Sequence, residues 1–281
     1  MMTITKEIII AFESYMVDAE KSESTQTNYI RCIKRFTCWL AERELSKKLV
    51  LQYKEEMTEK YKIASVNGII SALNSFFEFL QMSNLKVKTL KKQKEIFCSK
   101  EKEISKTEYE RLLDAALKKG DKRLFYIMQT ICSTGIRISE LKYVTVQALK
   151  DKYAEVRCKG KNRVVILPNE LCTSLRKYAQ KQGIVDGCIF ITRSGKAMNR
   201  SNIWNQMKKL CTIAKVLADK VFPHNLRHLF ARTYYSLQKD VVRLADILGH
   251  SSINTTRIYT LESGDVHRRQ IQKLGLVVLR E

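Results

Sequence analysis

The stretch TGIRISEL, residues 134–141, decides how the second half of the chain is organised. It follows a helical pattern over about 121–132, and Gly135 permits the turn that ends that helix. Downstream, YAEVRCKGKNRVVIL (153–167) alternates, is rich in β-branched residues and predicts a hairpin that turns at Lys159–Asn162. The other segments around it carry the apolar period of helices, so the sequence predicts a mostly helical α+β domain with one small antiparallel hairpin.

This domain is expected to cover residues 104–281, including a C-terminal tail. Ser105 and Glu108 fit a capping box, which opens the first helix. The tail LGLVVLRE (274–281) is apolar, and the sequence leaves open whether it docks on its own domain or on a neighbouring subunit. Further helices are predicted at about 169–182, 200–217, 223–237, 240–248, 252–259 and 265–274.

Residues 1–83 predict a separate all-α domain of four amphipathic helices, so the whole chain is expected to be mainly α. The third helix is expected at about 47–61 and the fourth at about 64–82. Residues 84–103 then form a lysine-rich segment, which we interpret as a basic linker.

The charge of the chain is unevenly distributed. Of 51 Lys+Arg and 29 Asp+Glu, residues 1–85 hold 11 of each, so the remaining residues hold 40 against 18 and carry the whole net charge of +22. Such a balance favours a polyanionic partner, most simply nucleic acid. The competing interpretation is that these charges only keep solvated helix faces soluble.

Several other classes of protein are excluded. No apolar run approaches the roughly 20 residues of a membrane span, and the acidic residues near the start argue against a signal peptide. Eight cysteines occur without a CxxC pair, which favours free thiols in a cytoplasmic protein. His224 and His228 have the i,i+4 spacing of a zinc helix, but Arg227 lies between them and would repel the metal, so we expect no metal.

Four segments carry residues suited to chemistry on phosphate: TGIRISEL (134–141), CKGKNR (158–163), PHNLRH (223–228) and LGHSSINTTRIYT (248–260). A phosphodiester gains charge on its non-bridging oxygens in the transition state, and guanidinium groups bind such oxygens in pairs and stay charged. Arg137 and Arg227 are therefore the candidate phosphate ligands. His224 can transfer a proton near neutral pH, and the Tyr259 phenol can attack phosphorus.

In order and spacing, these segments resemble the tyrosine recombinases of the phage integrase family. The resemblance extends to the N-terminal helices, which are similar to that family's SAM-like core-binding domain, and to a two-domain form without an arm-binding domain. It implies that Tyr259 is the nucleophile, that His250 hydrogen-bonds the phosphate and that a hairpin lysine is the general acid. We expect that lysine to be Lys159, with Lys161 as the competitor. Here the sequence has Cys158 and Leu261 where the family usually has glycine and histidine.

Other residues are expected to support this chemistry or to bind DNA. Glu140 lies three residues after Arg137 and is expected to orient it, while His228 is expected to pack behind the site. The predicted DNA contacts share a positive charge: Arg31, Lys34, Arg35, Lys86, Lys88, Lys91, Lys92, Lys94, Lys161 and Arg163.

The resemblance implies a bacterial or phage-type, mobile-element recombinase that cuts and rejoins DNA through a 3′-phosphotyrosine, without a cofactor. It further implies double-stranded DNA with paired sites, a homo-tetramer on that DNA and accessory DNA-bending proteins as partners. The sequence leaves integration, excision, inversion and dimer resolution open. Type IB topoisomerase-like relaxation and a non-catalytic DNA-binding regulator are the competing functions.

Overall fold

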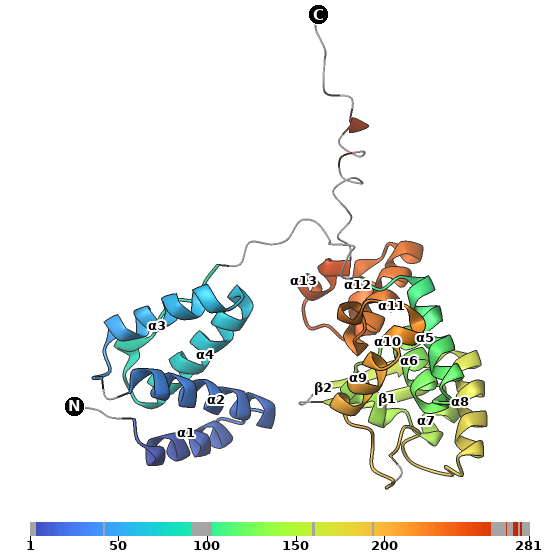
Figure 1. The fold of residues 1–281 in the computed structure, drawn as a ribbon, viewed down its shortest axis with the longest axis horizontal. Coiled ribbons are helices and arrows are strands. Elements are labelled where there is room, and N and C mark those ends of the chain that lie inside the picture. Colours follow the sequence, from blue (N-terminus) through green and yellow to red (C-terminus); the bar gives the residue numbers. More distant parts are fainter. Residues whose placement is uncertain are drawn as a thin grey trace, which may run out of the picture. The chain divides into compact units, whose positions relative to one another are not determined.

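The computed structural model describes residues 4–41, 43–91, 103–158, 161–192 and 194–259, together with 268, 272–274 and 276. At 158 and 161 it describes the backbone only. The chain separates into two compact units, Met1–Lys94 and Glu95–Glu281, each considered by itself below (Figure 1). The mainly α fold with one small antiparallel hairpin, expected from the sequence, is confirmed.

The first unit is a bundle of four helices. Each presents apolar residues three or four positions apart to a common interior, as Ile30, Ile33, Phe36 and Leu40 do on the second helix. Aromatic rings fill that interior, with Phe12 edge-on to Phe76 at a centroid distance of 5.1 Å. The helices are α1 (Lys6–Asp18), α2 (Glu23–Leu40), α3 (Lys47–Lys60) and α4 (Ile63–Phe79), followed by a 3-10 turn at Ser83–Leu85.

The first part of the segment expected to be a linker packs on this bundle. Leu85 and Val87 are buried in its core. Two asparagines of α4 hold the segment by its backbone: Asn74 bonds both the N–H and the C=O of Val87 at 2.9 Å, and Asn67 does the same for Leu90 at 2.8 and 2.9 Å. A linker can therefore begin only after residue 90, and residues 92–102 lie outside the described part of the chain.

The second unit is helical around one hairpin. The capping box predicted at Ser105 is present: its side chain accepts from the Glu108 N–H, and Glu108 accepts from the Ser105 N–H. The helix expected over 200–217 is instead two, because the chain turns after Lys208 and a second, short helix begins at Cys211. Lys215, with a left-handed φ of +51°, ends that second helix. The helices are α5 (Lys106–Lys118), α6 (Lys122–Thr134), α7 (Val146–Asp151), α8 (Asn169–Lys181), α9 (Arg200–Lys208), α10 (Cys211–Ala214), α11 (Pro223–Gln238), α12 (Val241–Leu248) and α13 (Ile253–Thr256), with 3-10 turns at Ile138–Tyr143, Ala218–Lys220 and Arg257–Tyr259.

The predicted hairpin consists of β1 (Tyr153–Cys158) and β2 (Lys161–Ile166), paired antiparallel with Tyr153 opposite Ile166 and Val156 opposite Arg163. Ala154, Val156 and Val165 point into the core, whereas Val164 and Ile166 are exposed. The pairing continues to Cys158 opposite Lys161, so the turn is shorter than the sequence suggested.

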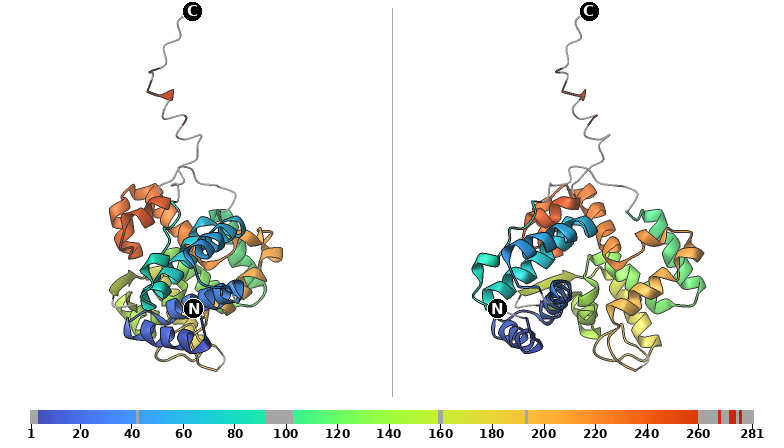
Figure 2. Two further views of the ribbon diagram at one scale, coloured as in Figure 1. Left: turned by 90° about the vertical axis from the view of Figure 1, so that its left-hand side faces the viewer. Right: turned by 60° about the vertical axis from the view of Figure 1, so that its left-hand side comes forward.

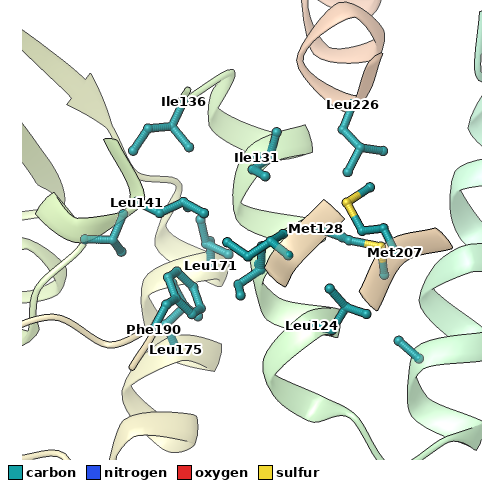
Figure 3. Close-up of a cluster of buried hydrophobic side chains, with 14 of the residues drawn as sticks. Leu124, Met128, Ile131, Ile136, Leu141, Leu171, Leu175, Phe190, Met207 and Leu226 are labelled. Atoms are coloured by element: carbon teal, nitrogen blue, oxygen red, sulfur yellow. The ribbon is translucent and has the colours of Figure 1, made fainter. Parts of the chain in front are cut away.

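Helix α6 contributes several side chains to the main apolar cluster of the second unit (Figure 3). Its Leu124, Met128 and Ile131 contribute to one apolar cluster with Leu171 and Leu175 of α8, Met207 of α9 and Leu226 of α11. Figure 2 shows α11 and α12 of this unit in orange, from two further directions. Helices α6 and α11 pack together, α11 carries His224, Arg227 and His228, and the turn after α6 leads to Arg137.

Candidate active site

Arg227 is the most deeply buried charged side chain of the site, with 1% of its surface exposed. Pro223 starts α11, which brings Arg227 to the inner face one turn later. Its guanidinium donates to the Gly135 carbonyl and, at 2.7 Å, to the Leu248 carbonyl. Burial and the neighbouring Arg137 and Arg163 charges lower the pKa of Arg227 to about 10, so it stays a cation at pH 7.

Arg137 reaches the same place from a different segment. Gly135 ends α6 at φ +63°, and a Cβ there would lie 2.5 Å from the Phe230 ring, so only glycine fits this turn. The turn sets Arg137 at the start of the 3-10 helix, where Nη2 donates to the Gly249 carbonyl at 3.2 Å. Its side chain is 37% exposed, so it can also reach a ligand.

Glu140 orients this arginine, as the sequence predicted from their spacing. The buried carboxylate accepts from Nη1 of Arg137 at 3.0 Å and from the Arg137 backbone N–H at 2.9 Å. It also pairs with Arg163. Burial alone would raise the pKa of Glu140, but the hydrogen bonds from Arg163 and Arg137 outweigh it and the pKa falls below its ordinary value. The carboxylate is therefore ionised at neutral pH.

Three histidines and Tyr259 form a cluster of rings beside Arg227. The His228 ring lies 4.6 Å from the His224 ring and 5.0 Å, edge to face, from the Tyr259 ring. The His250 ring lies 6.2 Å from the Tyr259 ring. His228 and Tyr259 are thus in direct contact, which agrees with a supporting position for His228.

These histidines are neutral at pH 7. Burial, together with the nearby cationic groups, lowers the pKa of His228 and of His250 to about 4 and lowers that of His224 as well. His250 Nε2 faces Arg227 Nη2 at 3.1 Å, and since Arg227 only donates, Nε2 is the acceptor. The Nδ1 hydrogen is then donated to Thr256 Oγ1, 2.8 Å away.

Tyr259 is 5% exposed and packs with Ala231, Leu244 and Leu248. Burial raises the pKa of its phenol, while the charge and hydrogen bond of Arg227 and the charge of Arg137 act in the opposite direction. The net effect leaves the phenol protonated at neutral pH, so a proton must leave when its oxygen becomes a nucleophile.

A cleft of about 510 Å³ opens in front of the arginines. Arg137, His224 and Arg227 line it together with Arg200 and Trp204 of α9, and none of the described residues that line it is acidic. Three guanidinium groups without a carboxylate in the lining suit a phosphate-bearing ligand. Sequence reasoning missed Arg200 and Trp204, whose i,i+4 spacing on one helix face is the only signal they carry.

The predicted DNA-contacting residues differ in their surroundings. Arg31 and Lys34 of α2 are exposed, as are Lys88 and Lys91. Arg35 is half-buried and donates to the Tyr61 hydroxyl at 3.1 Å, and Lys86 pairs with Glu78. Outside the described residues or side chains lie Lys92, Lys94, Lys159 and Lys161.

Arg163 pairs within the protein, with Glu140. It was predicted to contact DNA, but its side chain is only 13% exposed, pairs with Glu140 and donates from Nη1 to the Ile247 carbonyl at 2.8 Å. Arg163 shares one face of β2 with the buried Val165.

Among the described residues, no group of three or more His, Cys, Asp or Glu side chains could hold a metal ion. Within that same part of the chain, no helix is both long and apolar enough to cross a membrane. The cysteines at 32, 38, 132, 172, 188 and 211 are free thiols.

Comparison with known proteins gives a consistent result. Residues 102–264 match the phage integrase family model and residues 9–84 match the model of the phage integrase N-terminal SAM-like domain. The chain is 31% identical to tyrosine recombinase XerH of Campylobacter jejuni over 239 residues, covering 78% of this chain and 68% of that protein. It is 29% identical to tyrosine recombinase XerD of Proteus mirabilis, covering 73% and 70%. The crystal structure of a lambda integrase tetramer bound to a Holliday junction has a similar fold, with a TM-score of 0.71 at 17% identity, covering 90% of this chain and 76% of that one.

Proposed function

The chain belongs to the phage integrase family and is a tyrosine-type site-specific DNA recombinase, and we propose that Arg137, Arg227, His250 and Tyr259 are the residues with which it cleaves DNA. The observation that carries this assignment is their convergence. Arg227 hydrogen-bonds His250, and Arg137 donates to the carbonyl of Gly249, the residue before His250. The Tyr259 ring packs against the His250 ring.

In this proposal the two arginines bind the non-bridging oxygens of the scissile phosphate. Arg227 remains cationic at pH 7, and Arg137 and Arg227 both line the cleft. The carbonyls and Glu140 that hold them restrict their motion before DNA arrives, so less reorganisation is needed in the transition state. His250 adds a further hydrogen bond, and to donate from Nε2 it must take up a proton or change tautomer.

The phenol oxygen of Tyr259 then attacks phosphorus, and the bond from phosphorus to the 5′-oxygen breaks. The phosphodiester energy is kept in a 3′-phosphotyrosine, and the leaving 5′-oxygen takes a proton to become a hydroxyl. We assign that proton to Lys159, with Lys161 as the competitor, on the family resemblance. The phenol proton passes to a neutral histidine, for which we assign His224, the histidine that lines the cleft.

A covalent-capture assay tests the assignment of Tyr259. A pool of duplexes with a randomised core, nicked inside that core, lets the released 5′-hydroxyl fragment diffuse away, so that cleavage ends in a trapped adduct. Wild-type protein should yield DNA-linked protein that survives SDS, whereas Tyr259→Phe keeps the packed ring, lacks the nucleophile and should yield none. An adduct with the phenylalanine variant would contradict the assignment.

The recovered duplexes then serve in a two-site plasmid assay. Recombinant product supports strand exchange, whereas relaxation without product would support topoisomerase-like chemistry. We further propose a tetramer on paired DNA sites in the cytoplasm. The lambda integrase tetramer supports this assembly only through its fold.

A further inference from the structure

Three arginines from three separate segments meet at the C-terminal end of α12. Arg163 donates to the Ile247 carbonyl at 2.8 Å, Arg227 to the Leu248 carbonyl at 2.7 Å and Arg137 to the Gly249 carbonyl at 3.2 Å. The last carbonyls of a helix lack intrahelical partners and carry partial negative charge. The end of α12 therefore holds all three guanidinium groups in a defined order, directly before His250.

Arg163 differs from the other two. Arg137 and Arg227 line the cleft, and Arg163 does not. Besides the Ile247 carbonyl, its guanidinium bonds both oxygens of Glu140, the same carboxylate that orients Arg137. Through these bonds Arg163 connects the hairpin, Glu140 and the end of α12.

Gly249 is shaped to this arrangement. It ends α12 at φ +61°, and a Cβ on it would lie 2.4 Å from Cδ of Arg163. Glycine is therefore favoured at position 249 for two reasons. It adopts the left-handed backbone conformation readily, and the aliphatic part of the Arg163 side chain occupies the space that a Cβ would need. The packing of Arg163 and the path of the chain into His250 depend on each other.

We propose that Arg163 is a positioning residue for strand cleavage. Through Glu140 it sets the direction of Arg137, and through the α12 carbonyls and Gly249 it sets the place of His250. Its own guanidinium binds no DNA. This inference rests on the proposed function, since it concerns the rate at which Tyr259 forms the phosphotyrosine.

The test measures single-turnover adduct formation on one nicked duplex recovered with the wild-type protein. Arg163→Ala should slow the reaction by about a hundredfold, a loss comparable to that of one transition-state donor. Arg163→Lys keeps a positive charge beside Glu140, which guards against misfolding. One ammonium group cannot bond both Glu140 and the Ile247 carbonyl as the guanidinium does, so we expect the rate to fall by about tenfold.

A matched control comes from the neighbouring strand. Arg157 of β1 carries the same charge, but its side chain is 76% exposed and pairs only with exposed Glu155. Arg157→Ala should leave the rate of adduct formation within about threefold of wild type.

Substrate chemistry separates positioning from general damage. Replacing one non-bridging oxygen of the scissile phosphate by methyl removes its charge, and with it much of the demand for a well-placed Arg137. The deficit of both Arg163 variants relative to wild type should shrink by about tenfold on this methylphosphonate duplex. Equal deficits on both duplexes would overturn the proposal, because a damaged fold would not distinguish them.

DNA affinity provides the second readout. If Arg163 only positions other residues, its variants should keep the wild-type slope of log affinity against log salt. A slope shallower by about 0.9 would mean that Arg163 neutralises a phosphate, and the proposal would fall. Wild-type rates in both variants would also overturn it. Failure of the wild-type protein itself to form any adduct would instead remove the proposed function and this inference together.

Discussion

The two units of the molecule differ in what they bury. In the first unit, the fully buried side chains of the described residues are apolar, sulfur-containing or aromatic. In the second, the same interior also contains a glutamate, an arginine, an asparagine and three threonines: Glu140, Arg227, Asn225, Thr130, Thr134 and Thr256. Burying ionised groups is costly unless every one is paired. The interior of the first unit is therefore organised for packing alone. The second unit accepts a less stable interior in exchange for ordered charges.

The largest expected effect is a loss of chemistry at the buried arginine. Arg227→Lys keeps one charge, but a single ammonium cannot bond the Gly135 and Leu248 carbonyls, reach His250 and also hold two phosphate oxygens. We expect the single-turnover rate of adduct formation to fall by about a hundred- to a thousandfold. Hydrogen exchange in the first unit should stay unchanged.

The control for this variant is Arg243→Lys on α12, where the side chain is 69% exposed and pairs with Asp240. That change should leave the adduct rate unaltered. A similar loss of adduct rate in both variants would mean that any arginine in this region matters equally. The buried charge of the second unit would then have no special part in the chemistry.

A smaller effect, confined to stability, is expected in the first unit. Phe76 is fully buried against Phe12, and Phe76→Ala should lower the local free energy of unfolding by about 3–5 kcal/mol. Hydrogen exchange of α1 and α4 reports this change. For DNA already bound, the rate of adduct formation should stay near that of wild type, because Phe76 holds no reacting group. Leu51→Ala on α3, where the side chain is 42% exposed, is the matched control and should change exchange little.

Acid should affect the second unit more gradually. The pKa values of His228 and His250 are about 4 in the folded protein and near 6.5 when unfolded. Between these values the unfolded chain binds more protons, so the free energy of unfolding decreases as pH falls through that window. The urea midpoint of the second unit, followed by hydrogen exchange, should be lower at pH 5 than at pH 7.

His228→Gln removes one of these titrating groups and should reduce the difference between the two midpoints. Glu140 acts in the same direction at more acidic pH: its pKa is lowered in the folded state, so its stabilisation is present above its unfolded pKa and is lost as pH falls through its folded pKa. An unchanged midpoint difference in the glutamine variant would show that His228 does not titrate on unfolding.

Much of this organisation was predictable from local pattern. The four amphipathic helices and the hairpin follow from residue periodicity, and they are present. The capping box at Ser105 follows from a serine and a glutamate three residues apart, and it is present too. The helix boundary near Lys208 was not predictable, because the apolar pattern continues across the turn. The start of the predicted linker was placed by its lysines. Leu85 and Val87 are instead buried in the first unit, where Asn74 of α4 bonds the backbone of Val87, and a run of lysines does not show this contact.

The position of Arg163 against Glu140 could not be predicted from the sequence. Both faces of β2 carry apolar residues, with Val165 on one and Val164 and Ile166 on the other, so alternation alone cannot say which face is inside. With the opposite choice, Arg163 would point to solvent. Its buried position became evident only when the hairpin was packed against Glu140 and α12.

The amino-acid sequence by itself determined which side chains can do phosphoryl chemistry, in which order they occur and which local elements carry them, because these depend on residue type and short-range periodicity. The tertiary structure alone decided that Arg137, Arg163 and Arg227 would bond three successive carbonyls at one helix end, and that only two of them would line the cleft. The physical reason is that a helix end exposes unpaired carbonyls in one direction. Which cations reach them depends on how segments between 21 and 112 residues apart pack around a common core.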